Sequence, residues 1–364
     1  MPNRLLSLDV LRAVAVLLVL FRHARWSDDT NIALRVIARG GGVGVDLFFV
    51  LSGFLVSGLL FREFNETGKI KAGRFLLRRG FKIYPAFWCL LAVTVVCRLI
   101  VGESLPARAT FGELFFLQNY LPNGYWWHPN WSLAVEEHFY LVIPFLLIGL
   151  SGDRFAAVPR IAAAAMVAVL AARWFHSLAP ALADPELQWR RCYAPTHLRF
   201  DSLLFGVMLS YFYHYRPQFS AACRRHWLTL LVAGAALLSP PFIYEQFERR
   251  WLCSLGLTLG TLGAGAIVSS LVCRGITANG CTKSLALVGR HSYSIYLWHT
   301  IIQAWFLPLL GLPEWLETPA FFAASLGLGI QLSRWIEIPA LQLRDRLMGA
   351  NLASGTAMQT SCAS

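Results

Sequence analysis

Two residues with reactive side chains lie inside the first hydrophobic segment of the chain. The segment from Leu8 to His23 (LDVLRAVAVLLVLFRH) carries Asp9, Arg12 and His23 among mostly apolar residues. A charged group at membrane depth costs roughly 3 kcal/mol or more, so its presence indicates a polar interior or a reactive site. In a helix, the spacing of Arg12 and His23 places both within roughly 20° of one face and about 16 Å apart. We therefore expect both to line one channel.

These two side chains suit different parts of one reaction. Imidazole takes up a proton near neutral pH, so His23 is a candidate general base for a hydroxyl. A histidine that snorkels at the helix end, beside Arg22 and Arg25, is the alternative. Arg12 stays protonated and suits a phosphate, a carboxylate or a developing oxyanion. Its alternative is a structural pair with Asp9, one turn away.

Acids that could orient the His23 ring occur in two other apolar segments. Asp46 lies near the start of a predicted span, on the membrane side where His23 is expected. Glu136, in WSLAVEEHFY, is a rival for the same role. An acid beside the imidazole would orient it and stabilise its protonated form. Helix capping and headgroup contact are the alternatives for both acids.

Composition predicts the elements that must position these groups. The chain has 364 residues, of which 56% are hydrophobic and only 14% charged. This balance is typical of a polytopic integral membrane protein. Windows of about 20 mostly apolar residues predict an all-α fold with about ten transmembrane helices. They lie near residues 6–24, 43–61, 80–101, 132–150, 158–174, 198–215, 227–243, 252–273, 286–308 and 319–340.

An even number of spans places both termini on one side of the membrane. The loops on that side carry more Lys and Arg than the opposite loops, which favours cytoplasmic termini. The net charge of +12 is explained by basic loops that contact anionic lipid, so we expect no nucleic-acid partner. We predict one transmembrane domain over residues 1–345 and a disordered tail over 346–364. The eight scattered cysteines contain no C-x-x-C pair, so we predict no metal site.

Basic residues concentrate between the second and third predicted spans. Arg74, Arg78 and Lys82 are four residues apart and would share one helix face, with Arg79 beside them. Such a cluster suits the phosphates of a nucleotide-bearing thioester, and coenzyme A is the expected ligand. Ordinary positive charge in a cytoplasmic loop is the alternative.

Aromatic residues crowd the loop before the fourth predicted span. Tyr125, Trp126, Trp127 and Trp131 could stack on the apolar faces of sugar rings. An interfacial aromatic belt explains them equally well.

Other polar groups within the predicted spans favour structural roles. Arg199 and Asp201 are two residues apart and cannot meet along one helix, so we expect each to bond to a neighbouring helix. His299 is expected to be a hydrogen-bonded core histidine.

Six ordered blocks resemble the acyltransferase-3 family of membrane O-acyltransferases, which modify bacterial surface glycans. The blocks are LDVLRAVAVLLVLFRH, GVGVDLFFVLSGFLVSGLL, RRGFKIYPAFW, WSLAVEEHFYLVIP, LRFDSLLFG and GRHSYSIYLWH. The resemblance implies that His23 activates a hydroxyl against an acyl thioester, and its pattern points to Glu136 more than to Glu137. The family usually shows Arg-x-x-Arg where this chain has Arg79 and Lys82. That change places bidentate recognition by the second position in doubt.

The resemblance implies a multi-pass enzyme of the bacterial inner membrane. We predict transfer of an acyl group, most simply acetyl, from cytoplasmic acyl-CoA to a hydroxyl of a carbohydrate, polysaccharide or glycolipid. Arg12 and the basic cluster would hold the donor, membrane lipid would surround the chain, and no metal is required. A transporter or flippase is the alternative, because charges inside a membrane also occur in substrate pathways.

Overall fold

The computed structural model describes residues 6–27, 30–121, 125–178, 184–245 and 249–361. Within these ranges nearly all elements are helical and no strand occurs, which confirms the all-α prediction. The helices are α1 (Leu6–His23), α2 (Ile32–Gly40), α3 (Val43–Thr67), α4 (Ala72–Ile100), α5 (Ala107–Leu114), α6 (Trp131–Gly149), α7 (Val158–Ser177), α8 (Pro185–Gln188), α9 (Phe200–Tyr215), α10 (Pro217–Arg225), α11 (Trp227–Leu238), α12 (Pro240–Ile243), α13 (Leu257–Arg274), α14 (Gly280–Arg290), α15 (Ser292–Ile301), α16 (Glu314–Leu332) and α17 (Ile338–Ser361). The short elements include η1 (His128–Asn130), η4 (Thr196–Leu198), η5 (Leu252–Gly256), η6 (Ile302–Phe306) and η8 (Ser333–Glu337).

Every predicted span overlaps a helix or a run of helices, but several are shorter or interrupted. The span predicted over 227–243 divides at Ser239, because two prolines begin α12 where no helical N–H is needed. The span predicted over 286–308 divides at His291, between α14 and α15.

Five stretches of the described chain are long and apolar enough to cross a membrane, so the count of about ten is not established. These stretches are Val43–Thr67, Ala72–Ile100, His128–Gly149, Gly152–Ser177 and Leu252–Arg274.

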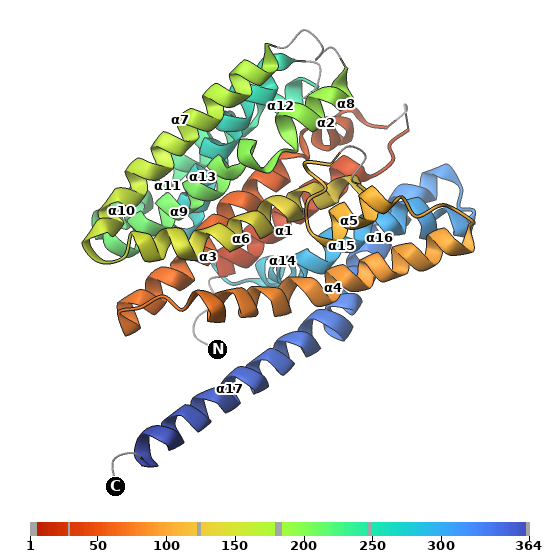
Figure 1. The fold of residues 1–364 in the computed structure, drawn as a ribbon. Coiled ribbons are helices and arrows are strands. Elements are labelled where there is room, and N and C mark those ends of the chain that lie inside the picture. Colours follow the sequence, from red (N-terminus) through yellow and green to blue (C-terminus); the bar gives the residue numbers. More distant parts are fainter. Residues whose placement is uncertain (1–5, 28–29, 122–124, 179–183, 246–248, 362–364) are drawn as a thin grey trace.

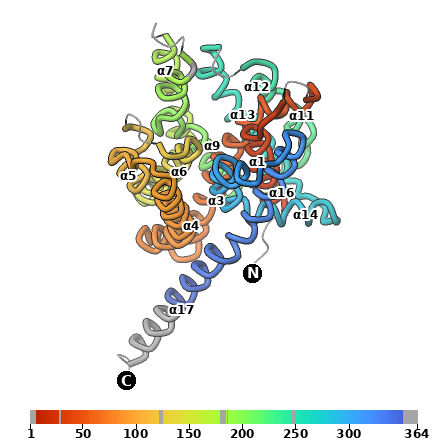
Figure 2. Tube along the Cα trace, turned by 90° about the vertical axis from the view of Figure 1, so that its right-hand side faces the viewer, coloured from red at the N-terminus to blue at the C-terminus, as the bar shows by residue number. Residues whose placement is uncertain are grey.

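Helix α9 lies inside the bundle, in contact with α3, α7 and α13 (Figures 1 and 2). Its closest approach is to α3, where two glycines face each other. A Cβ atom on Gly53 would lie 2.0 Å from the Leu203 carbonyl oxygen, and one on Gly206 would lie 2.3 Å from that of Val50. Only glycine permits this backbone contact.

Helix α17 leaves the bundle and projects away from it (Figure 1). The boundary predicted at residue 345 falls inside this helix. Residues 362–364 of the predicted tail lie outside the described residues, so the division into a domain and a tail stays a prediction.

A cluster of four buried charges joins α3, α7 and α9. The Arg199 guanidinium donates to Asp46 on α3 at 2.5 Å, and Arg173 on α7 donates to Asp201 on α9. Arg173 also donates to Thr258 at 2.9 Å. The side chains of all four charged residues are at most 6% exposed. The expectation that Arg199 and Asp201 bond to neighbouring helices is confirmed.

Removing one member of this cluster should destabilise the fold strongly. In Arg173→Met, Asp201 would keep a buried charge without its ion-pair partner, which costs about 3–5 kcal/mol. Replacing Asp201 with Asn in the same protein should restore most of the loss, since the remaining buried group is then neutral. Thermal unfolding midpoints in detergent test both variants. Equal midpoints for the single and double variants would contradict this account.

Candidate active site

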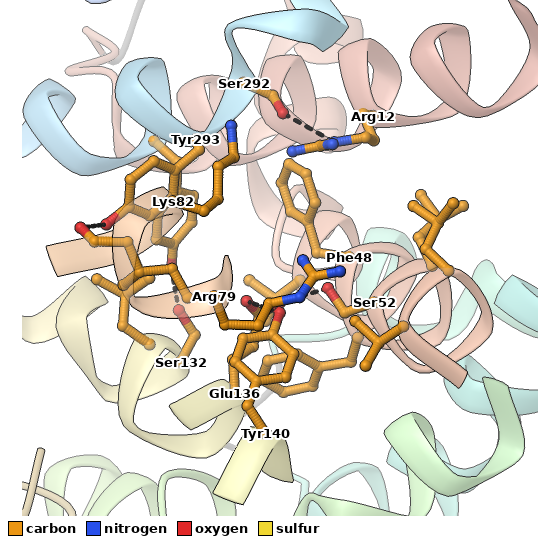
Figure 3. A pocket seen from close by; sticks show the side chains of 18 residues that line it. Arg12, Phe48, Ser52, Arg79, Lys82, Ser132, Glu136, Tyr140, Ser292 and Tyr293 are labelled. Atoms are coloured by element: carbon orange, nitrogen blue, oxygen red, sulfur yellow. Dashed lines mark hydrogen bonds between the residues drawn. The ribbon is translucent and has the colours of Figure 1, made fainter. Parts of the chain in front are cut away.

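A cavity of ≈ 800 Å³, its open mouth included, lies between α1, α3, α4, α6 and α15. Its wall is mostly apolar, and its charged groups are Arg12, Arg79, Lys82 and Glu136. The side chains of Arg12 and Arg79 point into the cavity from opposite walls, with Phe48 between them (Figure 3). An apolar chamber with a few converging polar groups is the usual form of a small-molecule site.

The polar groups of the cavity wall are held by hydrogen bonds between helices. Arg12 on α1 donates from Nε to Ser292 Oγ on α15 at 3.2 Å. Glu136 accepts from Ser52 on α3 at 2.7 Å and from Tyr140 on α6 at 2.9 Å. These bonds hold α1, α3, α6 and α15 around the cavity.

A second, more open cavity of ≈ 1410 Å³ lies at one end of the first. Arg79 and Lys82 line both cavities, so the two spaces meet at these residues. The second cavity is also lined by Arg74 and Arg78, which brings the predicted donor-binding cluster together in one place. Its remaining basic residues are Arg62, Lys71 and Arg344.

Lys82 is tied to the opposite wall at this junction. Its ammonium contacts Glu337 of η8, which is only 3% exposed at its side chain. Glu337 also accepts hydrogen bonds from Ser294 at 3.0 Å and Ser333 at 3.2 Å. The junction between the cavities is therefore built from α4, α15 and η8.

His23 lies behind the wall of the first cavity and is not one of its lining residues. Its ring contacts the ring of His299 on α15, with centroids 4.8 Å apart. The His299 ring in turn contacts Tyr296, with centroids 5.5 Å apart, and Tyr296 lines the cavity. The expectation that Arg12 and His23 line one channel is met only for Arg12. His23 is separated from the cavity by these two rings.

A backbone carbonyl orients His23. Its Nδ1 lies 2.9 Å from the carbonyl oxygen of Val19, one turn earlier in α1. A carbonyl oxygen only accepts, so Nδ1 carries the proton in the neutral ring and Nε2 has a free lone pair. That nitrogen is the one that can take a proton from a hydroxyl.

The two acids predicted to orient His23 have other partners. The carboxylate of Asp46 binds Arg199, and that of Glu136 binds Ser52 and Tyr140. Glu136 lines the cavity on the donor side, where Arg79 lies over the Tyr140 ring at 5.4 Å. Catalytic roles for Asp46 and Glu136 therefore stay predictions, without a contact to the base among the residues that the structure describes.

The aromatic loop is packed against the bundle. Trp131 is only 5% exposed, and its ring lies against Tyr193, Phe49 and the Arg199 guanidinium. The Trp131 ring is therefore enclosed by neighbours within the protein. Binding of a sugar by Trp131 stays a prediction, and this packing does not favour it.

The other three aromatic residues of the loop are partly buried. Trp127 donates to Thr94 at 3.0 Å, and Tyr125 donates to Asn119 at 3.0 Å. The backbone N–H of Trp126 donates to Glu113 at 3.1 Å. These three rings stay candidates for binding a sugar.

The sequence around this site matches a known protein family. The family model described as "Acyltransferase domain", acyltransferase family 3, matches residues 5–334. The chain belongs to the acyltransferase-3 family. The match to an acyltransferase domain favours an enzyme over the transporter alternative.

Several curated relatives are similar over most of this chain. The Peptidoglycan O-acetyltransferase OatA of Listeria monocytogenes is 27% identical over 339 residues, which are 85% of this chain and 51% of the relative. The O-acetyltransferase OatA of Staphylococcus aureus strain NCTC 8325 is 28% identical over 329 residues, 82% of this chain and 50% of the relative. The chain spans about half the length of these relatives. No solved structure matches.

The sequence does not predict the contacts that three residues in and near the site make. Glu337 and Glu113 are single acids in their segments, and no spacing in the sequence indicates their partners. His299 was expected in the core, and it is buried, but its contact with His23 depends on how α15 packs against α1. Within the described ranges, no group of three or more His, Cys, Asp and Glu side chains is placed to hold a metal ion.

Glu113 of α5 fixes the aromatic loop and should make its stability depend on pH. Besides the bond from Trp126, it accepts a hydrogen bond from Asn130 at 2.8 Å. Burial raises the pKa of Glu113 from 4.5 to about 7, although both hydrogen bonds lower it. The folded state therefore holds this proton more tightly than the unfolded state. The stabilisation of the folded state by protonated Glu113 is complete below pH 4.5 and is lost as the pH rises to about 7.

We predict that Glu113→Gln gains stability relative to the parent protein as the pH rises through this range. The amide stays neutral, so it avoids the cost of a buried charge, on the order of 3 kcal/mol. Thermal midpoints of both proteins from pH 4 to 8 measure the difference. A difference that stays constant with pH would show that Glu113 does not titrate in this range.

Proposed function

We propose that this enzyme moves an acetyl group from cytoplasmic acetyl-CoA to a hydroxyl of a bacterial cell-wall or other surface glycan. The names of the two relatives, a peptidoglycan O-acetyltransferase and an O-acetyltransferase, support the acetyl group and the glycan. The observation that carries the proposal is that two cavities meet at Arg79 and Lys82. In this proposal the two adjacent cavities serve as one path from a basic mouth to the apolar interior beside α1.

The basic cavity suits the nucleotide end of the donor. Arg74, Arg78 and Arg79 supply forked N–H donors, which bind phosphate oxygens in pairs. Beyond the junction, the apolar wall of the inner cavity and Arg12 suit the pantetheine arm and the thioester. Excess positive charge at this mouth also supports a cytoplasmic location for it, and for the termini, in the inner membrane.

His23 is the proposed base. The lone pair on Nε2 takes the proton of the acceptor hydroxyl, whose oxygen forms a bond to the thioester carbonyl carbon. The carbon–sulfur bond then breaks, and the thiolate receives the proton from His23. The products are the acetyl ester and free coenzyme A. In this proposal the thioester reaches the Tyr296 wall of the cavity, and a passage beside the Tyr296 and His299 rings must open for its carbonyl and the acceptor hydroxyl to meet His23.

Arg79→Ala tests the donor path. Arg79 lines both cavities, so its loss should raise the dissociation constant for acetyl-CoA by about tenfold or more, as expected for one charge-assisted hydrogen bond. Calorimetric titration of the detergent-purified protein measures the affinity. Arg224→Ala, an exposed arginine on α10 outside both cavities, is the matched control and should bind normally. Unchanged affinity in Arg79→Ala would reject the path.

His23→Ala tests the base. Release of free thiol from acetyl-CoA in the presence of a glycan acceptor should fall by at least a hundredfold, because general base catalysis contributes about 10²–10⁴-fold. Donor binding should persist. The matched control is His214→Ala, since His214 on α9 makes the same ring contact to a carbonyl one turn earlier, Ser210 at 2.9 Å, outside the cavity. Near-normal release by His23→Ala would remove His23 from this role.

A further inference from the structure

The side chain of His299 has an unsatisfied nitrogen in an enclosed position. The residue is 0% exposed, and Nε2 has no hydrogen-bond partner in the structure. Its Nδ1 lies 2.5 Å from the carbonyl oxygen of Tyr296, to which it donates. Nε2 is therefore a bare acceptor. A buried acceptor without a donor costs about 1–3 kcal/mol, so its retention calls for an explanation.

His23 is the neighbouring ring that can become a donor to this nitrogen. Two rings contact His299, those of Tyr296 and His23. The hydroxyl of Tyr296 already donates to the Pro129 carbonyl at 3.0 Å. At a centroid separation of 4.8 Å, no other side chain fits between the rings of His23 and His299.

In the structure the two histidines are in ring contact without a hydrogen bond between them, and their neutral tautomers would not allow one between the two Nε2 atoms. Each ring donates from Nδ1 to a backbone carbonyl of its own helix. Both Nε2 atoms are then acceptors, and two acceptors cannot bond to each other. One added proton changes this, because a protonated Nε2 of His23 becomes a donor.

We infer that His299 is the positioning residue that receives a hydrogen bond from His23 when His23 takes up the proton of the acceptor hydroxyl. This inference rests on the proposed function. The proton leaves the hydroxyl oxygen for His23 Nε2, whose single N–H is then shared between the reacting atoms and His299 Nε2, and it passes to the sulfur of the departing thiolate. No oxidant, metal or further reactant is needed. The other charged and titratable groups near His23 are Arg22 of α1 and His128 of η1, and neither supplies a buried acceptor.

The test measures protonation of His23 directly. Diethyl pyrocarbonate modifies only the unprotonated imidazole, so the pH dependence of modification of the His23 peptide, followed by mass spectrometry, gives its midpoint. His299→Leu removes the acceptor and should lower this midpoint by about one pH unit, the size expected from a charge-assisted hydrogen bond. His299→Asn keeps a carbonyl acceptor and should restore most of the shift. His214 in the same samples is the internal reference.

Two outcomes overturn the inference. One is an unshifted His23 midpoint in His299→Leu. The other is an equal shift in the Leu and Asn variants, which a general loss of packing would produce.

Thiol release separates this inference from the proposed function. A shifted midpoint in a protein that transfers no acetyl group to glycan keeps the histidine pair and rejects the function. Normal transfer with an unshifted midpoint rejects the pair alone. If the histidine pair and the proposed function both hold, His299→Leu should lower kcat with little change in KM for acetyl-CoA.

Discussion

The pairing of Asp46 with Arg199 and of Arg173 with Asp201 is the constraint on which the rest of this bundle depends. Charges so deeply enclosed must be neutralised by partners at fixed positions, because the apolar surroundings offer no water to replace them. The partners lie on three helices, so the cluster fixes how α3, α7 and α9 are rotated and aligned. Once α3 is fixed, Phe48 and Ser52 are directed to the cavity wall, and Ser52 can meet Glu136 on α6.

Helix α1 joins the two halves of the site. It presents Arg12 to the first cavity and His23 to the histidine pair, three turns further on. A rigid helix keeps this separation constant, which suits a reaction between a group fixed at one depth and a base at another. The carbonyl of Val19 orients the His23 ring locally. The helix that carries His23 therefore also sets its tautomer.

The sequence was sufficient to predict local features and insufficient for pairings between distant segments. Apolar windows predicted the positions of the helices, and a four-residue spacing correctly brought Arg74, Arg78 and Lys82 to one cavity. The partner of Asp46 is 153 positions away, and that of Lys82 is 255 away, so only packing of the whole bundle selects them. The sequence predicts Asp46 as an acid that orients His23. Nothing in the local pattern around Asp46 indicates its pairing with Arg199.

The contact between Gly53 and Gly206 links backbone shape to electrostatics. These residues lie two turns from Asp46 on α3 and little more than one turn from Asp201 on α9. A larger side chain at either glycine would wedge the two helices apart and thereby open the neighbouring charges to lipid. A substitution at one of these glycines can therefore expose a charged side chain although no charged residue has been replaced. The need to keep these acids and arginines enclosed restricts which side chains the two small residues can carry, although the residues do not touch those charges.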